Sequence, residues 1–286
     1  MRCIFCKKDS SNSKSVEHII PESLGNTEHI LPPGIVCDKC NNYFASNIEK
    51  HLLESRYFLY ARFENLIVSK KNRVPSVKGF HLKSQSIIDF TVTQKGLHVF
   101  VNKNDIPRFI NTTSEGGRLY LPHPTQPDDN YTLSRFIGKV AIEVIAFRIL
   151  EIPNALEVDL IDHSGLDLLR NFVRYGNKNI NWPIHRRELY PADALFYSEE
   201  DKSYYDIPHE FALLYTEKKE LFIVLAIFGI EYVMNLGGPE LEGYSEWLKK
   251  HDNKSPLYLD GIDYQSSRGV LPFLQNGSII HVFSND

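Results

Sequence analysis

The sequence predicts an α+β protein that consists of a small zinc-stapled module followed by a larger α+β domain. All four cysteines of the 286-residue chain lie within its first 40 residues, in two Cys-x-x-Cys pairs. The rest of the chain mixes segments with helical apolar spacing and segments that alternate like strands. We therefore expect the zinc module in residues 1–70 and an α+β domain in residues 71–286.

The composition fits a folded protein outside the membrane. Hydrophobic residues make up 42% of the chain, enough for a sizeable core. The N-terminus lacks the apolar segment of a signal peptide. The longest apolar run, residues 221–234, is too short to span a bilayer and contains Glu231. These features predict a cytoplasmic protein with no membrane partner.

Charge is distributed unevenly along the chain, whose net charge is −4. Residues 1–80 hold 12 Lys and Arg against 8 Asp and Glu, whereas the remaining 206 residues hold 20 against 28. A phosphate backbone would be attracted to the first part and not to the second. A solvated helix face followed by a basic linker would explain the same excess. The basic residues concentrate between positions 56 and 78, at Arg56, Arg62, Lys70, Lys71, Arg73 and Lys78.

The cysteine pairs predict a closed metal site. Two Cys-x-x-Cys turns supply four thiolates, the ligand set of a tetrahedral structural zinc ion. A thioredoxin-like redox pair is the alternative, but no βαβ pattern surrounds either pair. Thirty residues separate the pairs, more than in a simple zinc ribbon, so the loop between them carries an insert. The expected zinc ligands are Cys3, Cys6, Cys37 and Cys40.

The insert contains the segment VEHIIPESLGN, which we read as a short strand ended by Pro21. A second short strand is expected at residues 34–37, and a helix is expected after Cys40. Asn41 then falls at the helix start, near both zinc pairs and both strands. Asn41 as a helix N-cap is an alternative role, and Asn42 competes with it as a site residue.

Taken together, CIFC, VEHIIPESLGN and CDKCNN resemble the HNH endonucleases, or ββα-metal nucleases, of the variety stapled by a four-cysteine zinc site. The resemblance covers roughly residues 1–55. It implies that His18 is the general base and that Glu17 and Asn41 hold one catalytic divalent ion. Many relatives carry an asparagine where this chain has Pro32; either Asn26 or His29 takes its place, or the role is absent from this chain.

The residue types suit phosphodiester hydrolysis in their own right. A histidine supplies a base that titrates near neutral pH. Oxygen ligands from Glu17 and Asn41 suit Mg²⁺ or Mn²⁺, whereas four sulfurs suit zinc. The sequence therefore predicts a metal-dependent DNA endonuclease, and the resemblance extends this to a setting in restriction or defence against foreign DNA.

Two other classes of function remain open. One is a non-catalytic, zinc-stabilised module that binds nucleic acid, and the other is an interaction protein whose zinc module joins subunits. For the domain in residues 71–286 we expect a regulatory or targeting role, or homo-oligomerisation.

The same domain has a predicted order of elements. We expect two or three strands in residues 79–104 with a turn at 94–96, and a loop at 105–131. A buried helix at 132–150 and a helix at 167–176 follow. The last predicted element is a three-strand meander at 211–236, with a turn at 217–219 and a bend near Gly229.

Overall fold

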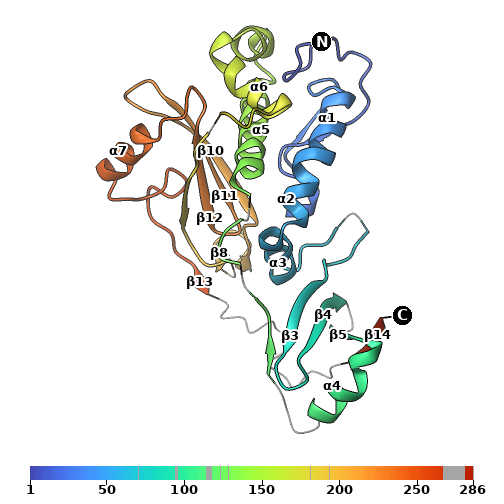
Figure 1. Cartoon of the computed structure of the whole chain (residues 1–286). Coiled ribbons are helices and arrows are strands. Elements are labelled where there is room, and N and C mark those ends of the chain that lie inside the picture. The colour runs from blue at the N-terminus through green and yellow to red at the C-terminus, as the bar shows by residue number, and fades with distance from the viewer. Residues whose placement is uncertain are drawn as a thin grey trace. The chain divides into compact units, whose positions relative to one another are not determined.

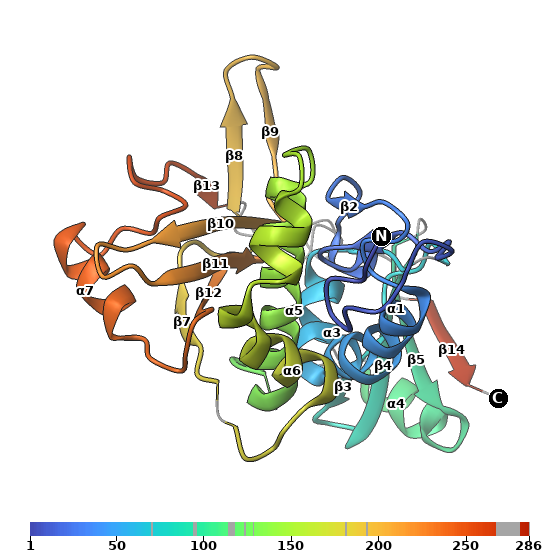
Figure 2. The ribbon, with the colours of Figure 1, turned by 90° about the horizontal axis from the view of Figure 1, so that it is seen from above.

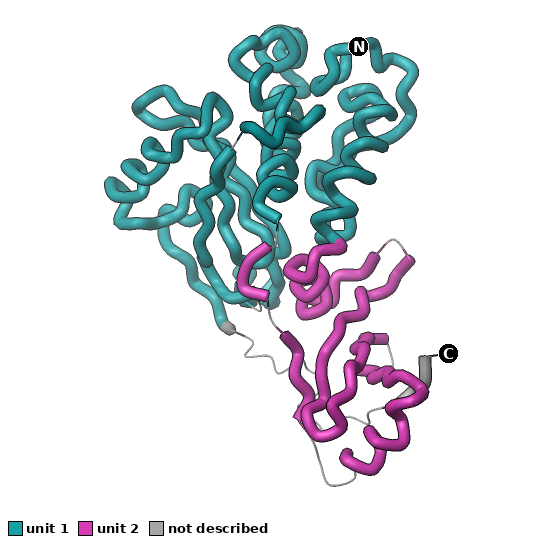
Figure 3. Tube along the Cα trace, viewed as in Figure 1, with its two compact units in different colours: residues 1–53, 129–267 teal, residues 54–128, 268–286 magenta. Residues whose placement is uncertain are grey.

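The computed structural model describes residues 1–69, 71–93, 96–113, 118–122, 124–127, 129–180, 182–192, 194–266 and 281–285. The chain forms two compact units, each built from two segments (Figure 3). Unit 1 comprises residues 1–53 and 129–267, and unit 2 comprises residues 54–128 and 268–286. The boundary predicted between residues 70 and 71 differs from this division, because the N-terminal module packs with helices that follow residue 129.

The N-terminal module has the expected order of strand, strand and helix. Strand β1 (Glu17–His18) pairs antiparallel with β2 (Ile30–Leu31), and the 3-10 turn η1 (Glu22–Leu24) lies between them. Helix α1 (Asp38–Phe44) runs on as a π-helical turn, η2 (Ala45–Glu49), and as α2 (Lys50–Glu54). The helix begins at Asp38, so Cys40 lies inside it rather than before it.

The second strand predicted at residues 34–37 is wrong; the chain makes a turn there. Gly34 has a φ of +95°, and the Ile35 amide donates back to the Pro32 carbonyl. Ile35 and Val36 are buried all the same, and the Ile35 carbonyl accepts from the Ile4 amide. Their apolar character therefore reflects burial under the first cysteine turn and not a strand.

Helix α5 (Asn130–Ile149) is the centre of unit 1, as predicted for residues 132–150. The Asp129 side chain caps it by accepting hydrogen bonds from the first amides of the helix. The helix contacts α6, η2, β2, β11 and β12, so it is covered on several sides. The next elements along the chain are η4 (Leu156–Ile161), η5 (Ser164–Leu166) and α6 (Asp167–Tyr175). Gly176, at a φ of +72°, ends α6 as predicted.

A four-stranded antiparallel sheet packs against α5 (Figures 1 and 2). Met234 lies beside Gly138 of α5, and Tyr244 of α7 (Glu242–Lys250) packs on Phe222 and Val224 of the opposite face. Both faces are thus covered, which explains the nearly continuous apolar sequence. The strand order is β10 (His209–Tyr215), β11 (Leu221–Ile227), β12 (Ile230–Asn235) and β7 (His185–Glu188), which confirms the predicted meander.

A smaller sheet completes unit 1. Strands β8 (Ala194–Ser198) and β9 (Ser203–Tyr205) form a hairpin that extends beyond the main sheet (Figure 2). Strand β13 (Gln265–Ser266) pairs with β8.

The described residues of unit 2 form a five-stranded sheet and the helices α3 and α4. Its strands run in the order β14 (His281–Asn285), β5 (Gly96–Asn102), β4 (Ser86–Thr93), β3 (Val77–His81) and β6 (Leu119–Tyr120). The strands predicted in residues 79–104 are confirmed, whereas Gln94 and Lys95 of the predicted turn lie outside the described residues. Helix α3 (Arg56–Glu64) supplies Tyr60 and Phe63 to the core of this unit.

The loop predicted at residues 105–131 is wrong. The 3-10 turn η3 (Lys103–Asp105) leads into helix α4 (Ile106–Thr113), and β6 follows. Pro107 does not prevent the helix, because it sits in the first turn, where its missing amide proton is not needed. Phe109 is 3% exposed and joins the core under the sheet, which gives this segment its reason to fold.

The basic stretch between positions 56 and 78 is less of a surface feature than its sequence suggests. Arg62 is 8% exposed, and burial lowers its pKa. Lys71, Arg73 and Lys78 are exposed, and Lys70 lies outside the described residues. In the part of the chain that the structure describes, no helix combines the length and apolarity needed to cross a membrane.

Candidate functional site

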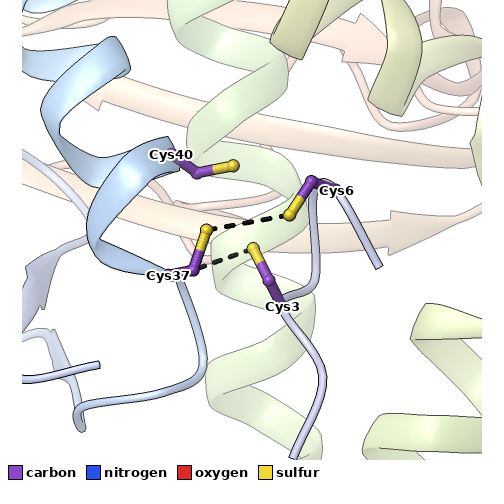
Figure 4. Close-up of side chains that lie close together, drawn as sticks. All are labelled: Cys3, Cys6, Cys37 and Cys40. Atoms are coloured by element: carbon purple, nitrogen blue, oxygen red, sulfur yellow. Dashed lines mark hydrogen bonds between the residues drawn. The ribbon is translucent and has the colours of Figure 1, made fainter. Parts of the chain in front are cut away.

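The four cysteines converge as the sequence predicts (Figure 4). Their Sγ atoms all lie within 4.8 Å of one another, and none forms a disulfide. The Sγ atoms of Cys6 and Cys37 are 3.7 Å apart. A tetrahedral zinc site with Zn–S bonds of about 2.3 Å has sulfur–sulfur edges of about 3.8 Å. The cluster therefore fits a metal ion such as zinc.

The second cysteine turn lies at a helix N-terminus. Cys37 is the N-cap of α1, and its carbonyl accepts from the amides of Cys40 and Asn41. A helix N-terminus stabilises negative charge. In the absence of a metal ion, burial raises the pKa of Cys37, and the hydrogen bond with Cys3 raises the pKa of Cys40. The Cys37 amide also donates to the Cys3 sulfur at 3.4 Å. A hydrogen bond with Cys40 lowers the pKa of Cys3 to about 5, so a thiolate is the favoured form of Cys3 near neutral pH.

Helix α6 holds both cysteine turns with two arginines one helical turn apart. The Arg170 Nε donates to the Ile4 carbonyl at 2.8 Å, inside the first turn. The Arg174 Nε donates to the Cys40 sulfur at 3.1 Å, and its guanidinium lies 4.0 Å from the centre of the Tyr43 ring. Partners of this kind orient and stabilise the ligands of a metal site. The sequence did not reveal them, since both residues lie more than 120 positions after Cys40.

The strand that carries Glu17 and His18 is short and firmly held. Glu17 pairs with Leu31 and His18 pairs with Ile30, and the Ile19 amide donates to the His29 carbonyl. The Asn26 side chain donates to the carbonyls of Ile20 and His29. Asn26 thus braces the end of β1 against the start of β2.

The two substitutes considered for Pro32 have different surroundings. Asn26 is fully buried and spans the two strands. The His29 ring packs against Phe147 and Phe211, away from the hydrogen bonds between the strands. The functional role of either residue stays a prediction.

His18 is half-buried in β1. Its Nδ1 atom is buried and has no hydrogen-bond partner among the described residues. A buried ring nitrogen without a partner is costly in a purely structural histidine. This observation agrees with a functional role for the ring and identifies no specific step.

Asn41 lies in the first turn of α1, next to β1. Its Nδ2 donates to the Val16 carbonyl at 2.9 Å, so it attaches the helix to the residue before Glu17. Because Cys37 is the N-cap, Asn41 does not have the capping role considered for it. Asn42 is exposed, one position further around the helix. The Asn41 side chain uses its nitrogen for this hydrogen bond to Val16. Its oxygen, Oδ1, is the atom suited to bind a cation.

Glu17 is 5% exposed and forms an ion pair that the sequence did not predict. Its Oε1 lies 2.6 Å from the Nζ of Lys139, which is fully buried on α5. Burial raises the pKa of Glu17, an effect that Lys139 partly opposes. One feature of the sequence could have indicated a buried cation here: Lys139 and Glu143 lie four residues apart within a mostly apolar helix.

The donor set of Glu17 and Asn41 fits a hard divalent cation by its chemistry, because both side chains offer oxygen. One oxygen of the Glu17 carboxylate is engaged by Lys139, and the other is the atom through which the residue could bind a metal. The four sulfurs and these two oxygens thus form two donor sets of different softness within one module.

Comparison with known proteins supports the resemblance. Residues 3–56 match the HNH endonuclease family model. The matched segment contains the four cysteines, Glu17, His18 and Asn41, and supports a nuclease-type function for the module. It ends well before Lys139, Arg170 and Arg174. No significant match to the chain was found among curated proteins or solved structures.

Proposed function

We propose that this chain is a metal-dependent endonuclease that hydrolyses DNA phosphodiester bonds with His18 as general base. The observation that carries the proposal is the hydrogen bond from Asn41 to the Val16 carbonyl, 2.9 Å long. It attaches the helix that carries Asn41 to the strand that carries Glu17 and His18. The three residues of the family motif lie on this strand and this helix, within the segment that matches HNH endonucleases, which supports the proposal.

Two metals have separate roles in this proposal. Zinc, held by the four cysteines, stabilises the module in a closed coordination shell. Mg²⁺ or Mn²⁺, held by Glu17 and Asn41, supplies positive charge to the scissile phosphate and the leaving oxygen. The residues of the chain do the rest: the His18 imidazole accepts a proton from the attacking water, and β1 and α1 hold it beside the two oxygen ligands.

Restriction or defence against foreign DNA is the setting that we propose for this activity, on the strength of the family resemblance. Residues 71–286 lie outside the matched segment, and we propose that they supply regulation, targeting or homo-oligomerisation. The exposed Lys71, Arg73 and Lys78 offer a surface that attracts a phosphate backbone.

A non-catalytic, zinc-stabilised nucleic-acid-binding module is the second candidate function. The ion pair between Glu17 and Lys139 favours it, because one oxygen of the carboxylate that would hold the divalent ion already serves a buried contact. The endonuclease remains the better supported of the two, because His18 and Asn41 are both in place.

The test is cleavage of plasmid DNA by the purified full-length protein with each divalent metal. His18→Ala should lower the cleavage rate by about 10²–10⁴-fold, the usual contribution of one general base. Its zinc content and DNA affinity should stay close to those of the wild type, because a base acts in the transition state. Glu17→Ala and Asn41→Ala should also lose activity, and should regain part of it at higher Mg²⁺ or Mn²⁺.

Two results would decide against the proposal. Wild-type cleavage by His18→Ala would remove His18 from the mechanism and with it the assignment of the site. Absence of cleavage by the wild type with every metal, together with retained DNA binding, would favour the non-catalytic module.

A further inference from the structure

Lys139 is a fully buried cation in the middle of the central helix. Its Nζ lies 2.6 Å from Glu17 Oε1, 2.9 Å from Glu49 Oε1 and 2.9 Å from Glu143 Oε2. An ammonium has three N–H donors, and three carboxylates surround this one. The side chains of Lys139 and Glu143 are 0% exposed, and those of Glu17 and Glu49 are 6% and 16% exposed.

The same ammonium also contacts the backbone of the active strand. Lys139 Nζ lies 3.4 Å from the carbonyl oxygen of His18. One side chain from α5 therefore contacts Glu17 through its carboxylate and His18 through its peptide. Lys139, which makes both contacts, lies outside the matched segment, residues 3–56.

The remaining anchors of this strand come from inside the module. Asn41 holds the Val16 carbonyl, and Asn26 holds the Ile20 carbonyl. Lys139 acts between these two positions, at Glu17 and His18. Without it, the two residues proposed to do the chemistry would lack their shared anchor in the middle of the strand.

The charge balance keeps Lys139 ionised. Burial alone would lower its pKa, but the carboxylates of Glu143, Glu17 and Glu49 outweigh burial and raise it well above its usual value. Burial raises the pKa of Glu143 well above its usual range; Lys139 opposes this effect, and the carboxylates of Glu17 and Glu49 add to it.

We propose that Lys139 is a positioning residue of the nuclease site, whose ammonium fixes the Glu17 carboxylate and the His18 peptide. This inference rests on the proposed function. By binding Oε1 of Glu17, Lys139 fixes the orientation of that carboxylate, in the way that outer partners orient metal ligands. Its contact with Glu49 is a second link between the module and α5, whereas its contact with Glu143 lies within α5.

The test compares Lys139→Met with Arg187→Met in the full-length protein. Arg187 is the control: it lies 2.6 Å from the fully buried Glu231 in unit 1, its own side chain is 21% exposed, and it is on the sheet and not on β1. Both substitutions remove a cation from a buried carboxylate and both should lower stability. Because the loss of Lys139 alone could prevent folding, Lys139→Met combined with Glu143→Leu is the second variant. It removes the fully buried carboxylate together with its cation, and the carboxylates that remain, Glu17 and Glu49, are 6% and 16% exposed.

Three measurements are made on zinc-loaded protein at a temperature where every variant is folded. Hydrogen exchange monitors the amides of residues 16–20, electron paramagnetic resonance monitors Mn²⁺ binding, and plasmid cleavage is measured against Mg²⁺ concentration. We expect the Lys139 variants to exchange faster in residues 16–20 and to lose about 10–100-fold in Mn²⁺ affinity or cleavage, the range for outer partners of a metal ligand. Arg187→Met should match the wild type in all three.

The outcomes separate this inference from the proposed function. If the wild type does not cleave DNA, the proposed function fails, and exchange and Mn²⁺ binding still decide on Lys139. Unchanged exchange and unchanged Mn²⁺ affinity in the Lys139 variants would overturn the positioning role. Equal losses in the Arg187 control would show that Lys139 contributes general stability only.

Discussion

Arg170 offers the sharpest test of how the later helices support the zinc module. The residue is 1% exposed. It donates to the Ile4 carbonyl at 2.8 Å and to the Leu160 carbonyl at 2.7 Å, and it pairs with Asp167. Arg170→Met keeps most of the side-chain volume but leaves two buried carbonyls without these donors.

The expected cost follows from those two carbonyls. A buried polar group that loses its partner costs about 1–3 kcal/mol, so two of them cost about 4 kcal/mol. Asp167 adds little, because its side chain is 41% exposed and Lys7 also pairs with it. For a unit of this size the loss corresponds to a fall in Tm of about 10 °C. Because Ile4 lies between two zinc ligands, zinc should also be released faster to a chromogenic chelator.

The control is Arg2→Ala, measured by urea unfolding and zinc release in parallel. Arg2 also links the first cysteine turn to the segment after α5, through Glu157 and Asp162, but its side chain is 38% exposed. Exposed pairs of this kind contribute little, so unfolding and zinc release should match the wild type. If Arg170→Met were as stable as Arg2→Ala, burial of the guanidinium would not be what anchors the first turn.

Two further predictions concern metal and pH. Purified protein should contain one zinc per chain by elemental analysis, and a chelator that removes it should unfold the module; absence of zinc with four freely reactive thiols in the folded protein would contradict this. Burial lowers the pKa of His209 to about 4, so the folded state favours its neutral form. Between pH 6.5 and 4 the unfolded chain then binds the extra proton, and stability should fall by about 2 kcal/mol as the pH drops. His209→Leu should flatten this part of a urea-unfolding series, and an unchanged pH slope would assign the acid sensitivity to other groups.

Secondary structure was predictable wherever local periodicity coincides with burial. Helix α5 extends from Asn130 to Ile149, close to the predicted 132–150, because its apolar residues repeat at helical spacing over five turns. The meander was predictable because Gly229 and the turn at 217–219 interrupt an apolar run. The predictions for residues 34–37 and 105–131 were wrong for opposite reasons. The first segment is apolar and buried without being a strand. The second contains a helix that packs through Phe109, despite its prolines.

The candidate site was predictable only as far as its chemistry is local in sequence. Four cysteines at the spacing of two turns predict a shared ion, and the structure brings their sulfurs together. The spacing of Glu17, His18 and Asn41 predicts a strand and a helix side by side, and the bond from Asn41 to Val16 agrees with that arrangement. Lys139 was visible as a charge in an apolar helix, but periodicity cannot say which distant carboxylate such a charge meets.

The non-local contacts explain why the module belongs to unit 1 rather than to a domain of its own. Within residues 1–53, Glu17 and Glu49 are carboxylates that share a cation from α5. Cys40 accepts a hydrogen bond from Arg174, and the Ile4 carbonyl accepts one from Arg170, both on α6. Each of these groups would lose its partner if the chain ended after the matched segment. A module of some 50 residues buries too little surface to absorb such losses, so the helices α5 and α6 are a physical part of the candidate site and not a separate attachment.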